Sequence, residues 1–313
     1  MRNSYYRLNT MIWKERFQGD SNPFDPITSV YVQPSLGKNI DDYTIPCLSD
    51  DESDAKAKLQ NAKSQPSAYW IDTKAKIENV KDILDDMKNG NKFTTVVFIV
   101  YDLPNRDCMA IASNGEICCD RSEDCQTFCT QMECQAKATD CTEGLNDYKT
   151  NYIDPLVDLF GKYPDLNIIL IIEPDSIPNS ITNKGQGGCT DVTLDTYSQG
   201  VNYALTQFSS LSNCTLYMDA GHGGWLGWQD NGTTYAQFVK DNNWSQYLRG
   251  FATNTSNYQQ LGNGACEIDL NGTYNDFLNT IKANTDGCGY DPCGLINQYN
   301  AATSELNYCQ LLQ

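Results

Sequence analysis

Two aspartates, Asp107 and Asp175, follow apolar runs and are the first candidates for chemistry. The run before Asp175, residues 168–172, is apolar throughout and is followed by Glu173-Pro174. Continuous apolar runs are typical of strands buried on both faces of a parallel sheet. Because proline cannot donate to a sheet, the strand should end there, placing Asp175 beyond its carboxyl end, where α/β enzymes hold catalytic groups. Partial desolvation would raise its pKa toward that of a general acid. An ordinary surface turn is the alternative.

Asp107 follows the second apolar run, residues 94–103. If both strands lie in one parallel sheet, the two carboxyl groups can meet, and their repulsion keeps one protonated while the other is ionised. Glycoside hydrolysis uses such a pair. The structural alternative is an ion pair of Asp107 with Arg106 or another cation, together with tryptophans buried in the core. The tryptophans that could instead stack on sugar rings are Trp70, Trp225 and Trp228.

His222 is the only histidine, which excludes metal sites built from several histidines. A Ser-His-Asp triad would have to use it, but the sequence contains no Gly-x-Ser-x-Gly elbow. A histidine in a glycine-rich loop is better suited to donating to a sugar hydroxyl. A Mg²⁺ site built from strand-end carboxylates is a second enzymatic alternative. The clustered tryptophans favour a sugar.

The elements that would hold these residues alternate between strand and helix. Such alternation predicts βαβ crossovers and a parallel sheet. Several strands end in an acid, which suggests a barrel with acids and indoles at its carboxyl face. We expect strands at residues 29–32, 67–72, 94–103, 168–172, 214–219 and within 247–257. We expect helices at residues 50–65, 76–87, 152–160 and 194–211.

The composition limits the partners and the compartment. The 313 residues suffice for one large α/β domain, and no apolar run is long enough to cross a bilayer. A net charge of −18 argues against nucleic acid and anionic membranes and is compatible with a neutral substrate. The 14 cysteines favour an oxidising compartment, although residues 1–17 lack the apolar core of a signal peptide. Glycosylation sequons agree with secretion, at Asn213, Asn231, Asn243, Asn254 and Asn271.

Six of the cysteines lie between Cys118 and Cys141. Their spacing fits no zinc signature, so we expect a small disulfide knot. The knot would either stabilise a loop or form a flap over the substrate.

Three stretches, residues 101–115, 171–179 and 217–228, resemble glycoside hydrolase family 6, the cellobiohydrolase II type of cellulase. The likeness begins near Asn22 and fades after Tyr258. It implies an N-terminal tail at residues 1–21 and a partial catalytic domain at 22–313, with a cysteine-rich insertion at 117–145. The implied fold is a distorted parallel (β/α) barrel. We expect it to be incomplete, with about six strands, because the family's later motifs, including the proposed base, are not found.

The resemblance also implies roles for individual residues. Asp175 would donate a proton to the leaving glycosidic oxygen, while Asp107 would tune its pKa and help organise the water. Tyr101 and Ser113 would lie at the cleavage subsite, and Asp219 is an acid that the family also has at this strand end. Glucosyl units would bind to Trp70, Asp72, His222, Trp225, Trp228 and Asn257.

The implied reaction is inverting hydrolysis of β-1,4-glucosidic bonds in cellulose, with carboxyl groups about 6.5–9.5 Å apart. It needs no cofactor or metal, and we expect a secreted monomer whose partner is a β-1,4-glucan chain. Cys108 and Cys189 match a family disulfide. One alternative is a truncated homologue that binds glucan without hydrolysing it, and another is a metal-dependent α/β enzyme.

Overall fold

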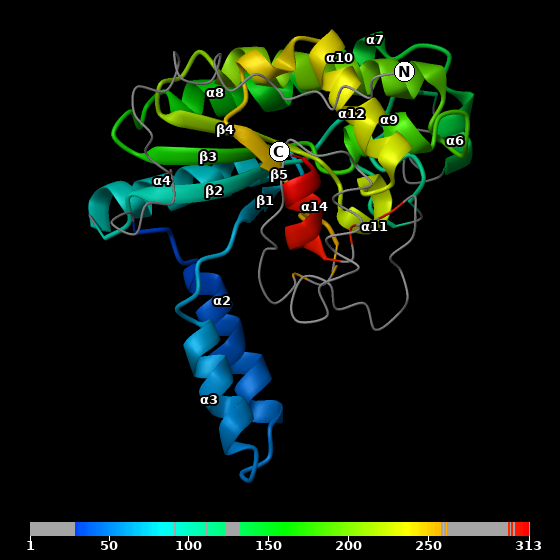
Figure 1. Cartoon of the computed structure of the whole chain (residues 1–313). Coiled ribbons are helices and arrows are strands. Elements are labelled where there is room, and N and C mark those ends of the chain that lie inside the picture. The colour runs from blue at the N-terminus through cyan, green and yellow to red at the C-terminus, as the bar shows by residue number, and fades with distance from the viewer. Residues whose placement is uncertain are drawn as a thin grey trace.

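The computed structural model describes residues 29–90, 92–110, 112–122, 132–257 and 304–312, together with 259, 261, 300 and 302. A parallel sheet with the strand order β1-β2-β3-β4-β5 lies at its centre (Figure 1). The strands are β1 (Tyr69–Ile71), β2 (Thr95–Val100), β3 (Asn167–Ile172), β4 (Cys214–Asp219) and β5 (Gly250–Ala252). The parallel α/β architecture expected from the sequence is therefore confirmed.

One predicted strand is wrong. Residues 29–32 form only an isolated bridge, between Val30 and Thr95, because the chain turns into a helix at Pro34. The described residues thus contain five strands, not six. The expected tail at residues 1–21 lies outside the described residues.

The three long strands form the apolar centre of the sheet. Their register places Phe98, Leu170 and Leu216 side by side, and all three side chains are buried. The Phe98 ring stacks on Phe160 at 5.6 Å between centroids, and Phe160 packs against Phe208 at 5.8 Å. These contacts join the sheet to the helices that cover it.

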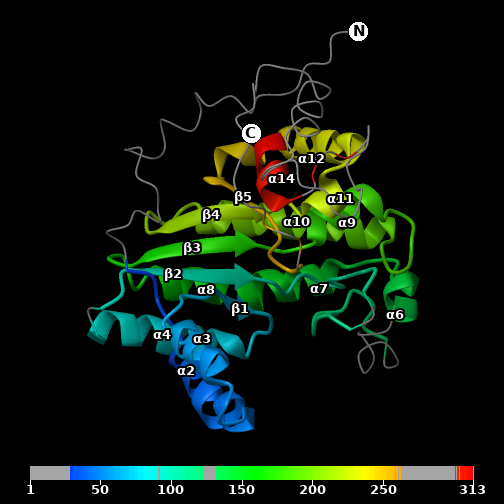
Figure 2. The same ribbon diagram turned by 60° about the horizontal axis from the view of Figure 1, so that its bottom comes forward.

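Helices α8 and α10 lie over one face of the sheet, whereas the short helices α9, α11 and α14 lie beyond the carboxyl ends of the strands (Figures 1 and 2). The helices are α4 (Lys76–Gly90), α6 (Met132–Lys137), α7 (Thr142–Asp147), the π-helix η3 (Tyr148–Ile153), α8 (Asp154–Phe160), α9 (Ser176–Thr182), α10 (Asp191–Phe208), α11 (Gly223–Leu226), α12 (Gln229–Asp241), the 3₁₀ helix η4 (Trp244–Gln246) and α14 (Glu305–Leu311). None of the helices in the described part of the chain is both long and apolar enough to cross a membrane.

An N-terminal helical hairpin projects away from this body in both views (Figures 1 and 2). Ile40 is its only buried residue. The solvated helix predicted at residues 50–65 is its second arm. The hairpin consists of α2 (Pro34–Asn39), η1 (Ile40–Thr44), η2 (Ile45–Cys47) and α3 (Ser53–Ala62).

Disulfides fasten the loops at the carboxyl end of β2. Cys108 is bonded to Cys189, 81 residues along the chain, and Cys119 is bonded to Cys141. Cys118 and Cys134 are also disulfide-bonded. The remaining two cysteines of the expected knot, Cys125 and Cys129, lie outside the described residues.

Candidate active site

Glu173 fixes the end of β3 to the end of β2. Its carboxylate accepts hydrogen bonds from the backbone N–H groups of Asp102 (3.2 Å) and Leu103 (3.3 Å). The Tyr148 hydroxyl donates to it at 2.8 Å. Burial raises the pKa of Glu173 to about 7, against these stabilising bonds. Two residues further on, this anchoring sets the position of Asp175.

Asp175 is held by residues at the end of β4 and in the loop after β5. Its φ is +64°, a left-handed conformation that aspartate adopts at a cost. Its backbone N–H donates to Asp219 Oδ2 at 3.0 Å, and Ser256 Oγ donates to Asp175 Oδ2 at 2.7 Å. Asp175 Oδ1 is buried without a hydrogen-bond partner among the described residues. One carboxyl oxygen is thus occupied and the other is free to carry a proton.

Burial raises the pKa of Asp175, and the negative charge of Asp107 raises it further. The Ser256 hydrogen bond acts in the opposite direction because it stabilises the ionised form. Asp107 follows β2 and Asp175 follows the neighbouring strand β3, so both residues belong to the same edge of the sheet. A neutral carboxyl group beside an ionisable partner can donate a proton to a bound molecule.

Asp219 supports this arrangement from the end of β4. It is 1% exposed, and its Oδ2 also accepts from the backbone N–H of Gly221 at 3.0 Å. The Thr255 hydroxyl forms a further hydrogen bond with it. Burial and the nearby Asp175 both raise the pKa of Asp219. Its contacts are with backbone and loop groups, which suits a residue that orients Asp175.

Asp107 lies in the loop beyond β2, also with a positive φ, of +54°. The Tyr101 and Ser113 hydroxyls both hydrogen-bond to its carboxyl group. Burial raises the pKa of Asp107, while these two hydrogen bonds and the positive charge of Arg106 lower it. The Tyr101 ring packs edge-on against Trp70 at 5.2 Å. The structure therefore brings Tyr101 and Ser113 into contact with Asp107 and places Trp70 beside Tyr101.

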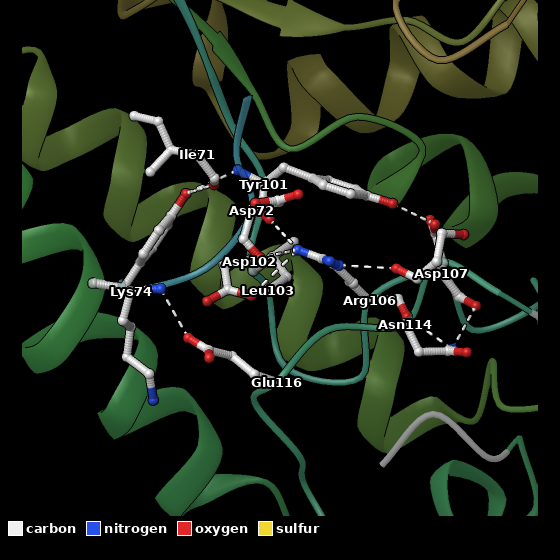
Figure 3. A network of polar contacts seen from close by, with 12 residues as sticks. Ile71, Asp72, Lys74, Tyr101, Asp102, Leu103, Arg106, Asp107, Asn114 and Glu116 are labelled. Atoms are coloured by element: carbon white, nitrogen blue, oxygen red, sulfur yellow. Dashed lines mark hydrogen bonds and ion pairs between the residues drawn. The ribbon is translucent and has the colours of Figure 1, made fainter. Parts of the chain in front are cut away.

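Arg106 organises this loop (Figure 3). Its guanidinium donates to the backbone oxygens of Ser113 (3.0 Å), Asp72 (2.7 Å) and Tyr101. Its ion pair, at 3.3 Å, is with Asp102 and not with Asp107, and its charge lies over the Tyr101 ring at 4.2 Å. One side chain thus fastens the ends of β1 and β2 to the loop that carries Ser113.

Asp72 takes part in this network chiefly through its backbone. Its carboxylate forms an ion pair with Lys76 at 2.6 Å. The side chain is 33% exposed, so a ligand could still reach it in competition with Lys76. Its predicted role in sugar binding stays a prediction.

A second group of predicted residues follows β4 and β5. The His222 and Trp225 rings lie 5.9 Å apart, and Trp225 Nε1 donates to Thr182 Oγ1 at 2.6 Å. Trp228 is 40% exposed. Asn257 is half-buried, next to Ser256. Because β3 is the central strand, Asp175 lies between this group and the one around Trp70 and Tyr101.

A metal site and a Ser-His-Asp triad were the other sites that the sequence left open. No three His, Cys, Asp or Glu side chains in this part of the chain are grouped so as to hold a metal ion. His222 Nδ1 is buried and has no hydrogen-bond partner among the described residues. It is therefore not arranged as the central member of a Ser-His-Asp triad there.

Comparison with known proteins identifies the family. The family model described as "Glycosyl hydrolases family 6" matches residues 26–133 and 125–283. The chain belongs to glycosyl hydrolase family 6. It is 32% identical over 283 residues to a probable 1,4-beta-D-glucan cellobiohydrolase C of Aspergillus niger, covering 86% of this chain and 56% of that protein. It is 33% identical to exoglucanase 3 of Agaricus bisporus, covering 73% of this chain and 49% of that protein. The chain thus spans about half the length of these family 6 relatives.

Solved family 6 structures share the fold. Cellobiohydrolase II (Cel6A) from Humicola insolens, in complex with glucose and cellotetraose, is similar with a TM-score of 0.63 and 28% identity. That match covers 79% of this chain and 64% of the other. The catalytic domain of Cellulomonas fimi Cel6B is similar with a TM-score of 0.69 and 26% identity, covering 93% and 62% of the two chains. The resemblance inferred from the three sequence stretches is therefore confirmed.

Sequence reasoning missed three residues that shape the site. The sequence indicates Arg106 only as an ion-pair partner of Asp107. It indicates Glu173 only as the residue at which a strand ends. Ser256 was not considered, because a single serine in a polar loop gives no signal of what it contacts. A buried arginine beside several backbone carbonyls could have been suspected only from its place inside the stretch 101–115.

Proposed function

We propose that the chain hydrolyses β-1,4-glucosidic bonds in cellulose and cello-oligosaccharides with inversion of configuration. The observation that carries the proposal is Asp175, a carboxyl group beyond the end of β3 whose pKa is raised by burial and by the negative charge of Asp107. The names of family 6 relatives, cellobiohydrolase and exoglucanase, support the substrate class.

In this proposal Asp175 is the general acid. Its neutral carboxyl group gives a proton to the glycosidic oxygen as the bond to the anomeric carbon breaks. Asp107 keeps Asp175 protonated through its charge, and Tyr101 presses against the sugar ring at the point of cleavage. A water held near Ser113 attacks the anomeric carbon from the opposite face and loses its proton to a base or to solvent.

Sugar units on either side of the cleaved bond would contact the aromatic residues. Trp70 would bind on the β1 side, and Trp225 and Trp228 on the side of β4 and β5. Aromatic rings present flat apolar faces, which suit the C–H faces of glucosyl rings. His222, Asp72 and Asn257 would hydrogen-bond the hydroxyl groups.

The same proposal includes secretion, which the disulfides favour. Among the sequons in the described residues, Asn243 is exposed in a left-handed turn and could carry a glycan. Asn213 is less suitable, since its amide donates to the backbone oxygens of Phe160 and Tyr163. Peptide mass spectrometry of protein secreted from a eukaryotic host would check this assignment.

The decisive experiment measures the release of reducing sugar from swollen cellulose by the unaltered chain, Asp175→Asn and Asp165→Asn. Asp165 is an exposed carboxylate just before β3, so its replacement makes the same chemical change at the far end of the strand. We expect Asp175→Asn to lower the rate at least about 100-fold and Asp165→Asn to leave it unchanged.

Three outcomes would contradict the proposal. Equal, near-zero rates for all three proteins would leave only glucan binding. Release of the β-anomer first, followed by NMR during cellotetraose hydrolysis, would show retention in place of inversion. A rate abolished by EDTA would instead indicate the metal-dependent alternative.

A further inference from the structure

The loop that carries His222 is held by a segment far along the chain. Gly223, the residue after His222, donates its backbone N–H to Glu305 Oε1 at 2.8 Å. Its backbone oxygen accepts from Asn300 Nδ2 at 3.2 Å. Both backbone polar groups of Gly223 are thus hydrogen-bonded to side chains about 80 residues away in the sequence.

A third bond fixes the start of the same loop. The Tyr308 hydroxyl donates to the backbone oxygen of Ala220 at 2.7 Å. Tyr308 and Ala302 also pack against Gly223 so closely that a Cβ there would lie 3.2 Å and 3.1 Å from their Cβ atoms. The residues that bracket His222 are therefore positioned by α14 and the residues just before it.

Glu305 is an unusual residue to find in such a place. It is 3% exposed, and burial raises its pKa. Its ionised form is stabilised by the Gly223 N–H and by the Thr253 hydroxyl, and its Oε2 has no hydrogen-bond partner among the described residues. Burying a carboxyl group with so few partners costs stability, whereas a methionine would fill similar space without that cost. The structure shows one role for the carboxylate at this place, which is to accept the hydrogen bond from the Gly223 N–H.

The loop in turn sets the aromatic groups. The His222 backbone oxygen accepts the N–H groups of Trp225 and Leu226, both at 2.9 Å, and so begins α11. A shift of the peptide between His222 and Gly223 would therefore move the His222 ring and the Trp225 ring together.

We propose that Glu305, with Asn300 and Tyr308, is a positioning residue that sets the sugar-binding geometry of His222 and Trp225. This proposal rests on the proposed function, because it takes the ligand of these two rings to be a β-1,4-linked oligosaccharide. Residues 300–308 lie outside the part matched to the family model, which ends at residue 283.

The test compares Glu305→Gln, Glu305→Met and Leu311→Ala in the full chain. Glutamine keeps an oxygen that can accept the Gly223 N–H, whereas methionine has similar length and no such acceptor. Leu311 packs on the core from the end of α14 and makes no described hydrogen bond to the loop, so its truncation loosens the helix alone. Cellotetraose affinity is measured by calorimetry, with Trp225→Ala as the positive control.

We expect Glu305→Met to weaken cellotetraose binding about tenfold, because a buried N–H loses its acceptor. Glu305→Gln should remain within about twofold of the unaltered chain. Leu311→Ala should lower the melting temperature at least as much as Glu305→Met and still bind within about twofold. Unchanged affinity in Glu305→Met, or an equal loss in Leu311→Ala, would overturn the proposal.

Hydrogen exchange at the Gly223 amide separates this proposal from the proposed function, since it needs no ligand. Exchange should be slow in the unaltered chain and in Glu305→Gln, and fast in Glu305→Met. If the unaltered chain does not bind cellotetraose, the proposed function fails, while slow exchange still supports the positioning of the loop by Glu305. Fast exchange at Gly223 in the unaltered chain would overturn the positioning role of Glu305 even if cellotetraose binds.

Discussion

At the scale of single residues, the two oxygens of Asp175 lie in different surroundings. Oδ2 accepts from Ser256, whereas Oδ1 has no partner among the described residues. In the neutral acid the proton therefore belongs on Oδ1, because Ser256 already donates to the other oxygen. A glycosidic oxygen that receives this proton must approach Oδ1, which restricts how the sugar chain can lie.

Ser256 and Asp107 should move the pH dependence of hydrolysis in opposite directions. Activity that needs neutral Asp175 is lost as pH rises through its pKa. Ser256→Ala removes a bond that stabilises the ionised form, so the pKa of Asp175 and the falling limb of kcat should move to higher pH. Asp107→Asn removes a negative charge, so the limb should move to lower pH. Profiles on a soluble cello-oligosaccharide check both shifts.

Ser256→Thr serves as the control, because it keeps the hydroxyl and should leave the limb in place. Shifts of both variants in the same direction would mean that these groups do not act on the acid of the reaction.

Arg106→Lys tests the network around Asp107. A lysine ammonium cannot span the backbone oxygens of Ser113, Asp72 and Tyr101 as the guanidinium does. We expect a loss of about 2–3 kcal/mol in the free energy of unfolding, because buried acceptors lose their donors, together with a lower kcat. Urea denaturation measures the first effect.

Arg121→Lys is the matched control, since Arg121 forms a partly exposed ion pair with Asp147. It should change the free energy of unfolding by less than about 1 kcal/mol. Equal losses in the two variants would show that the Arg106 network contributes no more than a surface ion pair.

At the scale of elements, the apolar runs predicted β2 and β3 and the placement of Asp175 beyond β3. This succeeded because strands buried on both faces must be apolar throughout, which is visible in a single sequence. The contact of Glu305 with Gly223 could not be predicted, because it joins segments 82 residues apart and depends on how the intervening chain folds. The left-handed backbone of Asp107 and Asp175 was equally hidden, since aspartate usually adopts other conformations.

The disulfide between Cys108 and Cys189 joins the loop after β2 to the segment before α10. It closes a loop of 81 residues, so replacing both cysteines by alanine should lower the free energy of unfolding by about 3–4 kcal/mol. Cys47→Ser changes an exposed free cysteine and should have no measurable effect. Thermal and urea unfolding of the two variants check the difference, and a double variant as stable as the unaltered chain would contradict the estimate.

At the scale of the whole molecule, the hairpin from α2 to α3 is set apart from the sheet that holds the site (Figure 1). Its two ends lie together, since Gln33 Nε2 donates to the backbone oxygen of Ala68 at 3.1 Å. The hairpin could thus be removed without separating the strands on either side of it.

Replacing residues 34–65 by a short Gly-Ser linker should therefore leave the melting temperature within about 2 °C and cellotetraose affinity unchanged. Differential scanning calorimetry and binding calorimetry check the two expectations. A large fall in affinity would place the hairpin among the elements that contact glucan, and a large fall in melting temperature would show that it supports the sheet.

The fastening of Gly223 has a consequence for how the protein is made. Translation delivers strands β1 to β5 before it delivers Glu305 and Tyr308. The sheet that they form can therefore assemble while the His222 loop still lacks its hydrogen bonds to these two residues. The positioning of His222 for a sugar chain would then come later than the assembly of these strands. In a ribosome-bound chain stalled before Asn300, Asp175 would already follow its strand. The loop that carries His222 would still lack its contacts with Glu305 and Tyr308.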